Sequence, residues 1–184
     1  PAALTDVSLA YEWILKHRAE FGATEEAPIV GGESAGANLS LALTAATCWE
    51  RPEPYAKRVF GLETPPAAVI PACGILEVAN ADRYLSNASI PLWIRDRVKA
   101  VCRNYLPDQS GDPDRWALAN PLTFLAGAPP PAHPLPPVFA PCGSKDPIVD
   151  DTERLAAVLK RWDNGSRAKL YPGGGHAFHA MVWT

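Results

Sequence analysis

A serine held between two glycines is the residue in this sequence with the clearest chemical potential. Residues 32–36 read Gly-Glu-Ser-Ala-Gly, a G-x-S-x-G pattern that presents a serine hydroxyl on a tight strand-to-helix turn. An apolar run, 27–32, precedes the motif and predicts the strand, and a second apolar run follows it. We expect glycine at 32 and 36 to prevent a clash across the turn. The alternative is an ordinary turn in which Ser34 caps the helix.

A serine nucleophile needs a base, and four histidines are candidates. His17 falls within an expected helix, and His133 lies inside a proline-rich segment. His176 and His179 follow an expected strand, at the edge of the sheet where the serine also lies. Three glycines, 173–175, would let the chain bend tightly before His176. We therefore assign the base to His176, and the alternative is a loop histidine without a role.

An acid that orients the base should follow the preceding strand. Asp146 lies there, in the Gly-Ser-Lys-Asp-Pro turn of residues 143–147. Asp150 and Glu153 have the spacing of a helix capping box, and Asp151 would occupy the first turn of that helix. Asp146 has no such local role, so we assign the acid to it. The order along the chain is the one used by a class of serine hydrolases: Ser34, Asp146, His176.

The elements that must position these residues alternate along the chain. Helical periodicity or an apolar run predicts helices over residues 5–21, 34–49, from about 89 to 105, and 150–162. Short apolar runs predict buried strands over residues 27–32, 67–72, 138–140 and 168–171. This alternation predicts an α/β fold, a mostly parallel sheet with helices on both faces. Ligand sites in such sheets lie at the carboxyl ends of the strands.

Residues 73–106 form a long connection after one of these strands. We expect this segment to supply one wall of a substrate pocket, with Trp93 contacting an apolar part of the substrate. Glu33 and Ile148 are further candidate substrate contacts, because each lies within two residues of a candidate catalytic residue. The alternative is a helix packed on the sheet, with the apolar residues of the segment as core.

Two further segments have structural and functional interpretations. Residues 129–137 are rich in proline, which is typical of a stiff connector, or of a polyproline ligand for a partner. Residues 31–36 are glycine-rich, but they lack the lysine of a phosphate-binding loop and contain a glutamate instead. We favour the connector for the first segment and the nucleophile turn for the second.

The composition excludes some classes of function. The chain has 184 residues, 47% of them hydrophobic, and a formal net charge of −3, which suits one domain with a sizeable core. A nucleic-acid-binding protein would show a basic surface, so no nucleic-acid partner is expected. No apolar run approaches the roughly 20 residues that span a bilayer, and the first residues do not have the pattern of a signal peptide.

The cysteines point to a reducing compartment. Cys48, Cys73, Cys102 and Cys142 form no C-x-x-C pair, which argues against a zinc site or a small disulfide scaffold. We expect four buried thiols and hence a cytoplasmic protein. The alternative is one disulfide between Cys73 and Cys142, since each follows an expected strand.

Three segments together resemble the hormone-sensitive-lipase-like (GDXG-type) carboxylesterases of the α/β-hydrolase fold. They are residues 32–39 (GESAGANL), 143–151 (GSKDPIVDD) and 171–178 (YPGGGHAF), and the opening residues 1–7 are also similar. The resemblance spans essentially the whole chain, residues 1–184. Glu33 stands where many members have aspartate. Members also carry an upstream His-Gly-Gly-Gly segment and a cap helix, and neither occurs in this sequence.

The resemblance implies ester hydrolysis through an acyl-enzyme, with a small-molecule ester as substrate and without a metal or other cofactor. Ser34 would attack the carbonyl, His176 would act as base, Asp146 would orient the imidazole, and the Ala35 N–H would bind the oxyanion. The absent segments imply a C-terminal portion of the fold that lacks its N-terminal strands, so we expect weak activity and an exposed sheet edge from these 184 residues alone. Activity should fall as His176 is protonated, around pH 6–7.

Two other functions fit parts of the same pattern. A serine peptidase or a deacetylase on this fold would have the same order of triad residues. A non-catalytic ligand receptor would keep the fold, but it would have no need of all three residues. Covalent labelling of Ser34 by a fluorophosphonate would separate the receptor from the hydrolases.

Overall fold

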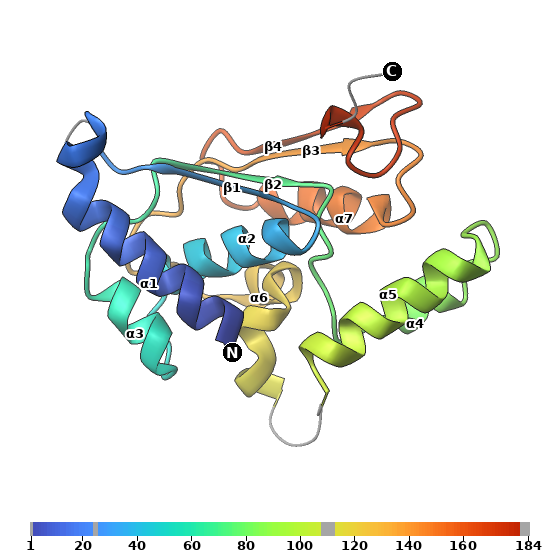
Figure 1. Cartoon of the computed structure of the whole chain (residues 1–184), viewed down its shortest axis with the longest axis horizontal. Helices are drawn as coiled ribbons and strands as arrows, with labels where there is room; N and C mark the ends of the chain where they lie inside the picture. Colours follow the sequence, from blue (N-terminus) through green and yellow to red (C-terminus); the bar gives the residue numbers. More distant parts are fainter. Residues whose placement is uncertain (1, 24–25, 108–112, 181–184) are drawn as a thin grey trace.

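The structure, a computed structural model, describes residues 2–23, 26–107 and 113–180. Figure 1 shows a layer of strands lying on a layer of helices. The strands are β1 (Ile29–Glu33), β2 (Ala68–Ala72), β3 (Phe139–Gly143) and β4 (Arg167–Tyr171). The α-helices are α1 (Ala2–His17), α2 (Ala35–Cys48), α3 (Pro54–Phe60), α4 (Asp82–Leu85), α5 (Leu92–Tyr105), α6 (Pro121–Gly127) and α7 (Val149–Leu159). Short 3-10 helices are η1 (Arg18–Phe21), η2 (Pro113–Ala119) and η3 (Phe178–Ala180).

All four strands run parallel, in the spatial order β1-β2-β3-β4. β1 pairs with β2, and β3 pairs with β4. The two pairs meet where Val69 of β2 lies opposite Val138, just before β3. The parallel sheet that the sequence predicts is therefore confirmed, and the four expected strands are present within a few residues of their predicted bounds.

The ladder between β2 and β3 is interrupted by two prolines. Val69 N donates to Pro137 O and Cys73 N donates to Pro141 O, each at 3.0 Å. Between these two bonds, the regular spacing of a parallel ladder calls for amide donors at positions 71 and 141. Both positions are proline, which has no N–H to donate. The sheet therefore consists of two well-bonded pairs of strands that are joined along a weak line.

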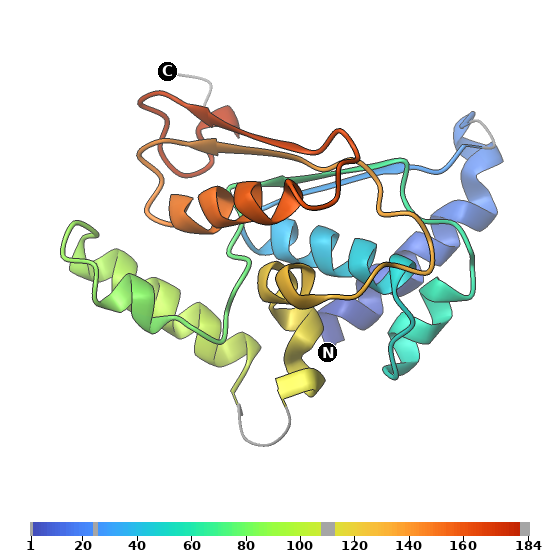
Figure 2. The ribbon, with the colours of Figure 1, turned by 180° about the vertical axis from the view of Figure 1, so that it is seen from behind.

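The helices that pack directly on the sheet lie on one of its faces. α2 packs on β1 and β2, and α7 packs on β3 and β4. Both views show these helices on the same side of the strands (Figures 1 and 2). On the opposite face, Ile29 is 63% exposed and Ile70 is 36% exposed. The α/β class is thus confirmed, and in the described part of the chain one face carries the helices that were expected on both.

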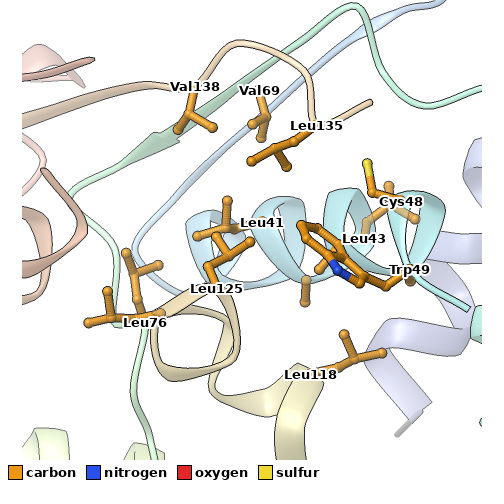
Figure 3. Packing of buried hydrophobic residues seen from close by; sticks show 14 of the residues in the cluster. Leu41, Leu43, Cys48, Trp49, Val69, Leu76, Leu118, Leu125, Leu135 and Val138 are labelled. Atoms are coloured by element: carbon orange, nitrogen blue, oxygen red, sulfur yellow. The ribbon is translucent and has the colours of Figure 1, made fainter. Parts of the chain in front are cut away.

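The main core forms around α2, whose buried surface extends nearly all round, as its apolar sequence predicts. Figure 3 shows Leu41 and Leu43 of this helix between Val69 and Val138 on the sheet side and Leu118 and Leu125 on the other. All six side chains are essentially inaccessible to solvent. This packing fixes the start of α2, and with it the Ser34 turn, against the sheet.

A second, smaller core forms around α4 and α5, two helices that Figure 2 shows lying away from the sheet. Apolar side chains of the segment 73–106 form most of this core, and Ile148, just before α7, belongs to it as well. Its buried members are Ile75, Val78, Tyr84, Ile90, Val98, Cys102, Leu106 and Ile148. α5 therefore packs on this cluster and not on the sheet. The alternative in which these apolar residues serve as core is right for most of them, although the core is a separate one.

The proline-rich segment is a connector that packs on the rest of the molecule. The backbone N–H groups of Ala132 and His133 both donate to Cys48 O at the end of α2. The His133 ring stacks on Phe60, with 4.5 Å between ring centroids. Leu135 is buried in the main core. These contacts hold the segment in place as it leads into β3, which supports the connector interpretation.

Some elements lie outside the sequence-based expectations. α3, η2 and α6 lie outside the helices expected from the sequence. Within the ranges that the structure describes, no helix is long and apolar enough to cross a membrane.

Candidate active site

Ser34 lies at the turn between β1 and α2 with a strained backbone. Its φ of 56° and ψ of −111° are rarely adopted by a residue with a side chain. Its N–H donates to Ala72 O at 3.0 Å, and its carbonyl accepts from Asn38 N at 3.3 Å. The turn is thus pinned to β2 on one side and to the first turn of α2 on the other.

The two motif glycines have different roles. A Cβ at Gly32 would lie 2.2 Å from the carbonyl oxygen of Gly36, a distance that no side chain tolerates. A Cβ at Gly36 itself would meet nothing within 4 Å. The clash expected at both positions therefore exists only at Gly32. Gly36 instead lets the backbone of the first helical turn approach Gly32.

The Ser34 hydroxyl does not cap α2. Ser34 occupies the N-cap position, but its side chain makes no capping hydrogen bond, so the capping alternative fails. Ala35 is the first residue of α2, and the N–H groups of a first helical turn have no partner within the helix. The hydroxyl and the Ala35 N–H are therefore both available to a ligand.

Asp146 and His176, separated by 30 residues in sequence, are joined directly. His176 Nδ1 lies 2.9 Å from Asp146 Oδ2, and Asp146 Oδ1 accepts a hydrogen bond from Ile148 N, also at 2.9 Å. The Asp146 side chain is fully buried, whereas 38% of the His176 side chain is exposed. The buried carboxylate of Asp146 thus bonds to Nδ1 of His176, an imidazole that is itself partly exposed to solvent.

The two loops that carry this pair are bonded together. Lys145 N donates to Gly174 O and Ser144 N donates to Tyr171 O, each at 2.9 Å. Gly143 makes this contact sterically possible, because a Cβ there would lie 2.2 Å from Gly174 O. The carboxyl ends of β3 and β4 therefore bring the acid and the base together, as expected of parallel strands.

The Asp146–His176 pair changes the pKa of both groups. Burial opposes ionisation of Asp146, but hydrogen bonds from His176 and from the Ile148 N–H outweigh it, so the pKa of Asp146 is lowered. The hydrogen bond to Asp146 raises the pKa of His176 above its ordinary 6.5, against the opposing effect of burial. The carboxylate therefore stabilises the imidazolium, as an orienting acid should.

The two alternative aspartates have other partners. α7 begins at Val149 with Ile148 as its N-cap and without a side-chain cap, so the expected capping box of Asp150 and Glu153 is wrong. Asp151 lies in the first turn of α7, as expected, but its side chain is completely buried. Asp151 Oδ2 accepts hydrogen bonds from the backbone N–H groups of residues 76 and 77, at 2.6 and 3.2 Å.

Asp151 also forms a buried ion pair with Arg83, at 2.5 Å. Burial raises the pKa of Asp151, although Arg83 acts in the opposite direction. The pair ties α7, which starts three residues after Asp146, to the segment that carries α4 and α5. Asp151 is thus a structural anchor for the segment 73–106 that sequence reasoning did not identify.

The second candidate base, His179, contacts the nucleophile motif instead of Asp146. His179 Nε2 lies 3.3 Å from Glu33 Oε2, and both side chains are partly exposed. This contact places the loop of His176 against the turn of Ser34. In the described part of the chain the Ser34 hydroxyl has no hydrogen-bond partner, and catalytic hydrogen bonds are often long before substrate binds.

Cys73 is a neighbour of the pair that the sequence analysis did not assign to the site. It follows β2 with a φ of 48°, and its side chain is completely buried. Its sulfur, one carboxylate oxygen of Asp146 and one ring nitrogen of His176 all lie within 4.8 Å of one another. All four cysteines are free and buried, so the expectation of buried thiols is confirmed, and the alternative disulfide is absent.

Cys142 lies beside both Cys73 and Asp146. Its single S–H has two acceptors, the Asp146 carboxylate at 3.5 Å and the sulfur of Cys73. A hydrogen bond from Cys142 lowers the pKa of Cys73, and the same contact raises the pKa of Cys142 together with burial. Cys73 is therefore the thiol of this pair that ionises more readily.

A cavity of about 400 Å³ has Asp146 among its lining residues. Residues of both the segment 73–106 and the acid loop line it, among them Arg83, Ile90, Pro91 and Lys145. Trp93 is 72% exposed and does not line this cavity. Ile148 is buried in the second core. The suggested substrate contacts of Trp93 and Ile148 therefore gain no support from the geometry.

Comparisons with known proteins agree with this architecture. A family model described as the alpha/beta hydrolase fold matches residues 1–180. No curated protein sequence matches the chain. Solved structures do match it, and they include esterase LipW from Mycobacterium marinum, with 20% identity and a TM-score of 0.72 over 99% of this chain.

Two further structures have similar scores. An esterase/lipase from an uncultured bacterium is 23% identical, with a TM-score of 0.68 over 100% of this chain. An esterase from the bacterial hormone-sensitive lipase family is also 23% identical, with a TM-score of 0.69 over 97% of this chain. The chain spans about half the length of these structures, from 52% to 55% of each. By its family match over nearly all its residues, the chain belongs to the α/β-hydrolase fold family.

Proposed function

We propose that this protein hydrolyses carboxylic esters of small molecules, with Ser34 as nucleophile, His176 as base and Asp146 as acid. One observation carries the proposal: a buried carboxylate is bonded to a partly exposed imidazole at the sheet edge where Ser34 has a strained backbone. The three residues come from three different loops. Among the described residues the Ser34 hydroxyl has no hydrogen-bond partner, and it does not cap α2, so the strained serine has no structural role that the hydroxyl would explain.

The mechanism begins with proton transfer from the Ser34 hydroxyl to His176. Because Nδ1 of His176 bonds to Asp146, Nε2 is the nitrogen left to accept this proton. The serine oxygen attacks the ester carbonyl, and the resulting imidazolium returns the proton to the departing alcohol. A water molecule, deprotonated by the same nitrogen, then attacks the acyl-enzyme and releases the acid. Asp146 remains ionised throughout and stabilises the positive imidazolium.

The oxyanion of each tetrahedral intermediate would bind the Ala35 N–H at the start of α2. The positive end of the helix dipole adds to this interaction. The Ser34 N–H cannot contribute, because it already donates to Ala72 O. An oxyanion-hole donor of this kind contributes roughly 10²–10³ in rate.

The test is hydrolysis of p-nitrophenyl butyrate by the protein, together with labelling by a fluorophosphonate. Ser34→Ala should abolish both turnover and labelling. Ser86→Ala is a matched control, because Ser86 is exposed and its hydroxyl donates to Arg83 O. Labelling that persists in Ser34→Ala would refute Ser34 as the nucleophile.

Paired variants test the acid and the base in the same way. His176→Gln and Asp146→Asn should each lower kcat by several orders of magnitude. His179→Gln and Asp150→Asn are their matched controls, since these neighbours contact other partners. A larger loss in either control than in its partner variant would reassign the role.

We also propose that residues 73–106 form one wall of the substrate pocket, through Ile90 and Pro91 in the cavity beside Asp146. Replacing Ile90 by Ala should change the preference among p-nitrophenyl esters of increasing acyl length. Trp93→Ala is the control, because Trp93 lies mostly in solvent. If Trp93→Ala alone changes the preference, then Trp93 and not Ile90 contacts the acyl group.

A further inference from the structure

Three different metal-binding groups converge at the candidate active site, and two of them belong to its proposed acid and base. The sulfur of Cys73, a carboxylate oxygen of Asp146 and a ring nitrogen of His176 are mutually within 4.8 Å. They come from three loops that follow β2, β3 and β4. Two of the three residues are buried, Cys73 at 0% exposure and Asp146 at 3%. A cluster of this composition differs from the exposed acidic groups that are common on protein surfaces.

The ligand set matches the preferences of zinc. Zn²⁺ binds thiolate sulfur at about 2.3 Å, imidazole nitrogen at about 2.0–2.1 Å and carboxylate oxygen at about 2.0–2.2 Å, in tetrahedral geometry. Ligand atoms around such an ion are separated by roughly 3.5 Å, a value that follows from these bond lengths. No two of the three atoms would therefore have to approach each other by more than about 1.3 Å. Mg²⁺ and Ca²⁺ prefer oxygen ligands, so a sulfur ligand disfavours them.

We propose that Cys73, Asp146 and His176 form a binding site for Zn²⁺, and that the bound ion switches off hydrolysis. Binding displaces one proton, from the Cys73 thiol to solvent, while the carboxylate and the neutral imidazole bind without proton exchange. The fourth coordination position is left to water. The metal-binding part of this proposal stands independently, and the inhibitory part rests on the proposed function.

Occupancy would block catalysis whichever ring nitrogen of His176 binds the ion. Zinc on Nε2 would remove the lone pair that accepts the Ser34 proton. Zinc on Nδ1 would remove the hydrogen bond to Asp146, which is 2.9 Å long in the metal-free geometry, and would leave the other nitrogen in the wrong protonation state. In both cases the negative charge of Asp146 offsets that of the bound ion and is no longer available to stabilise an imidazolium.

The ion has a route into the site. The side chain of His176 is 38% exposed and that of Asp146 is buried, so a cation would meet the imidazole first and then the two deeper ligands. Gly173 and Gly175 precede His176 in its loop, and a Cβ at either position would meet nothing within 4 Å.

The experiment measures metal binding directly and then its effect on turnover. Zn²⁺ binding to the full chain is measured by calorimetry in a phosphine reductant, and Co²⁺ is used as a spectroscopic substitute. We expect one Zn²⁺ per chain and a near-ultraviolet thiolate-to-cobalt band. Cys73→Ser should abolish this band and weaken Zn²⁺ binding by more than the roughly 10–100-fold that loss of an outer-sphere partner costs.

Matched variants separate the site from other cysteines and from misfolding. Cys102→Ser removes a buried thiol of the second core and should leave Zn²⁺ affinity unchanged. His176→Gln removes a ligand at a half-exposed position and should weaken binding even if Cys73→Ser fails to fold. In turnover assays, Zn²⁺ should inhibit the wild type, a chelator should restore the metal-free rate, and Cys73→Ser should resist inhibition relative to its own metal-free rate.

Each outcome bears on one part of the proposal. Absence of the cobalt–thiolate band in the wild type, or equal Zn²⁺ affinity in wild type and both ligand variants, overturns the site. Equal inhibition of wild type and Cys73→Ser overturns the switch. If Zn²⁺ binds through Cys73 but no form of the protein hydrolyses esters, the proposed function fails while the metal site stands.

Discussion

Gly143→Ala should separate the acid from the base without altering either residue. Gly143 ends β3, and its α-carbon faces the loop that carries His176. A Cβ there would lie 2.2 Å from the oxygen of Gly174 and 2.6 Å from that of Gly175. Atoms of this kind approach no closer than roughly 3.2 Å, so the loop would have to retreat by about 1 Å. The Lys145 N–H bond to Gly174 O, now 2.9 Å long, would then be lost.

The expected effect follows from the same displacement. A retreat of about 1 Å would lengthen the His176–Asp146 contact from 2.9 Å to nearly 4 Å, which is no longer a hydrogen bond. Misplacement of a catalytic group by about 1 Å costs roughly 10²-fold in rate. Insertion of a methyl group into a packed contact destabilises by about 1–3 kcal/mol. We therefore expect kcat to fall by roughly 10²-fold with a moderate loss of stability.

The assay compares Gly143→Ala with Gly175→Ala by turnover of p-nitrophenyl butyrate and by urea unfolding. Gly175 lies in the same loop, but a Cβ there would meet nothing within 4 Å, so this control should keep both activity and stability. A fluorophosphonate titration gives the number of active molecules, so kcat is counted per folded enzyme. Wild-type kcat in Gly143→Ala would refute the reasoning, because the acid and base loops would then not need their close contact.

Other consequences of the geometry are open to measurement. The pKa of His176 is raised above 6.5, so its neutral, active form is lost as the pH falls through that raised value. The acid limb of the kcat/KM profile should therefore have its midpoint above pH 6.5. A midpoint below pH 6.5 would contradict the Asp146 contact. Gly32→Ala should destabilise the protein or abolish labelling of the turn, whereas Gly36→Ala, which meets no atoms, should be tolerated in both thermal unfolding and fluorophosphonate labelling. Asp151→Ala removes the closest acidic partner of the largely buried Arg83, which keeps longer contacts of 3.6 Å with Glu77 and Asp150. It should lower the free energy of unfolding by no more than the roughly 3–5 kcal/mol that breaking a buried ion pair costs, and an unchanged urea midpoint would argue against the anchor.

The sequence was informative wherever a residue's environment is set by its near neighbours. Short apolar runs predicted all four strands, and the nearly all-apolar stretch after Ser34 predicted a buried helix, which α2 is. Placement of loops at the carboxyl ends of parallel strands brought Asp146 and His176 together as expected. These inferences depend on local pattern and on one general property of parallel sheets.

Other features depend on contacts between distant segments, which local pattern does not reveal. Asp151 looked like a first-turn helix residue, but its partner Arg83 lies 68 positions away along the chain. Cys73 and Gly143 acquire their importance only when three loops meet at one edge. Gly36 resembled Gly32 in the motif, yet the two differ because only one α-carbon faces the opposite backbone. α5 does not pack on the sheet, because the apolar side chains of residues 73–106 form a separate cluster on which it packs.

The paired prolines between β2 and β3 separate the three proposed catalytic residues as well as the strands. Ser34 follows β1, which is bonded to β2, whereas Asp146 and His176 follow β3 and β4. If the β1–β2 pair shifted relative to the β3–β4 pair, Ser34 would therefore move relative to His176, while Asp146 and His176 would move together. The alignment of attacking oxygen and proton acceptor then depends on side-chain packing beneath the sheet more than on backbone bonding within it. Thermal or mechanical shear at this line would uncouple the nucleophile before it disturbed the carboxylate–imidazole contact.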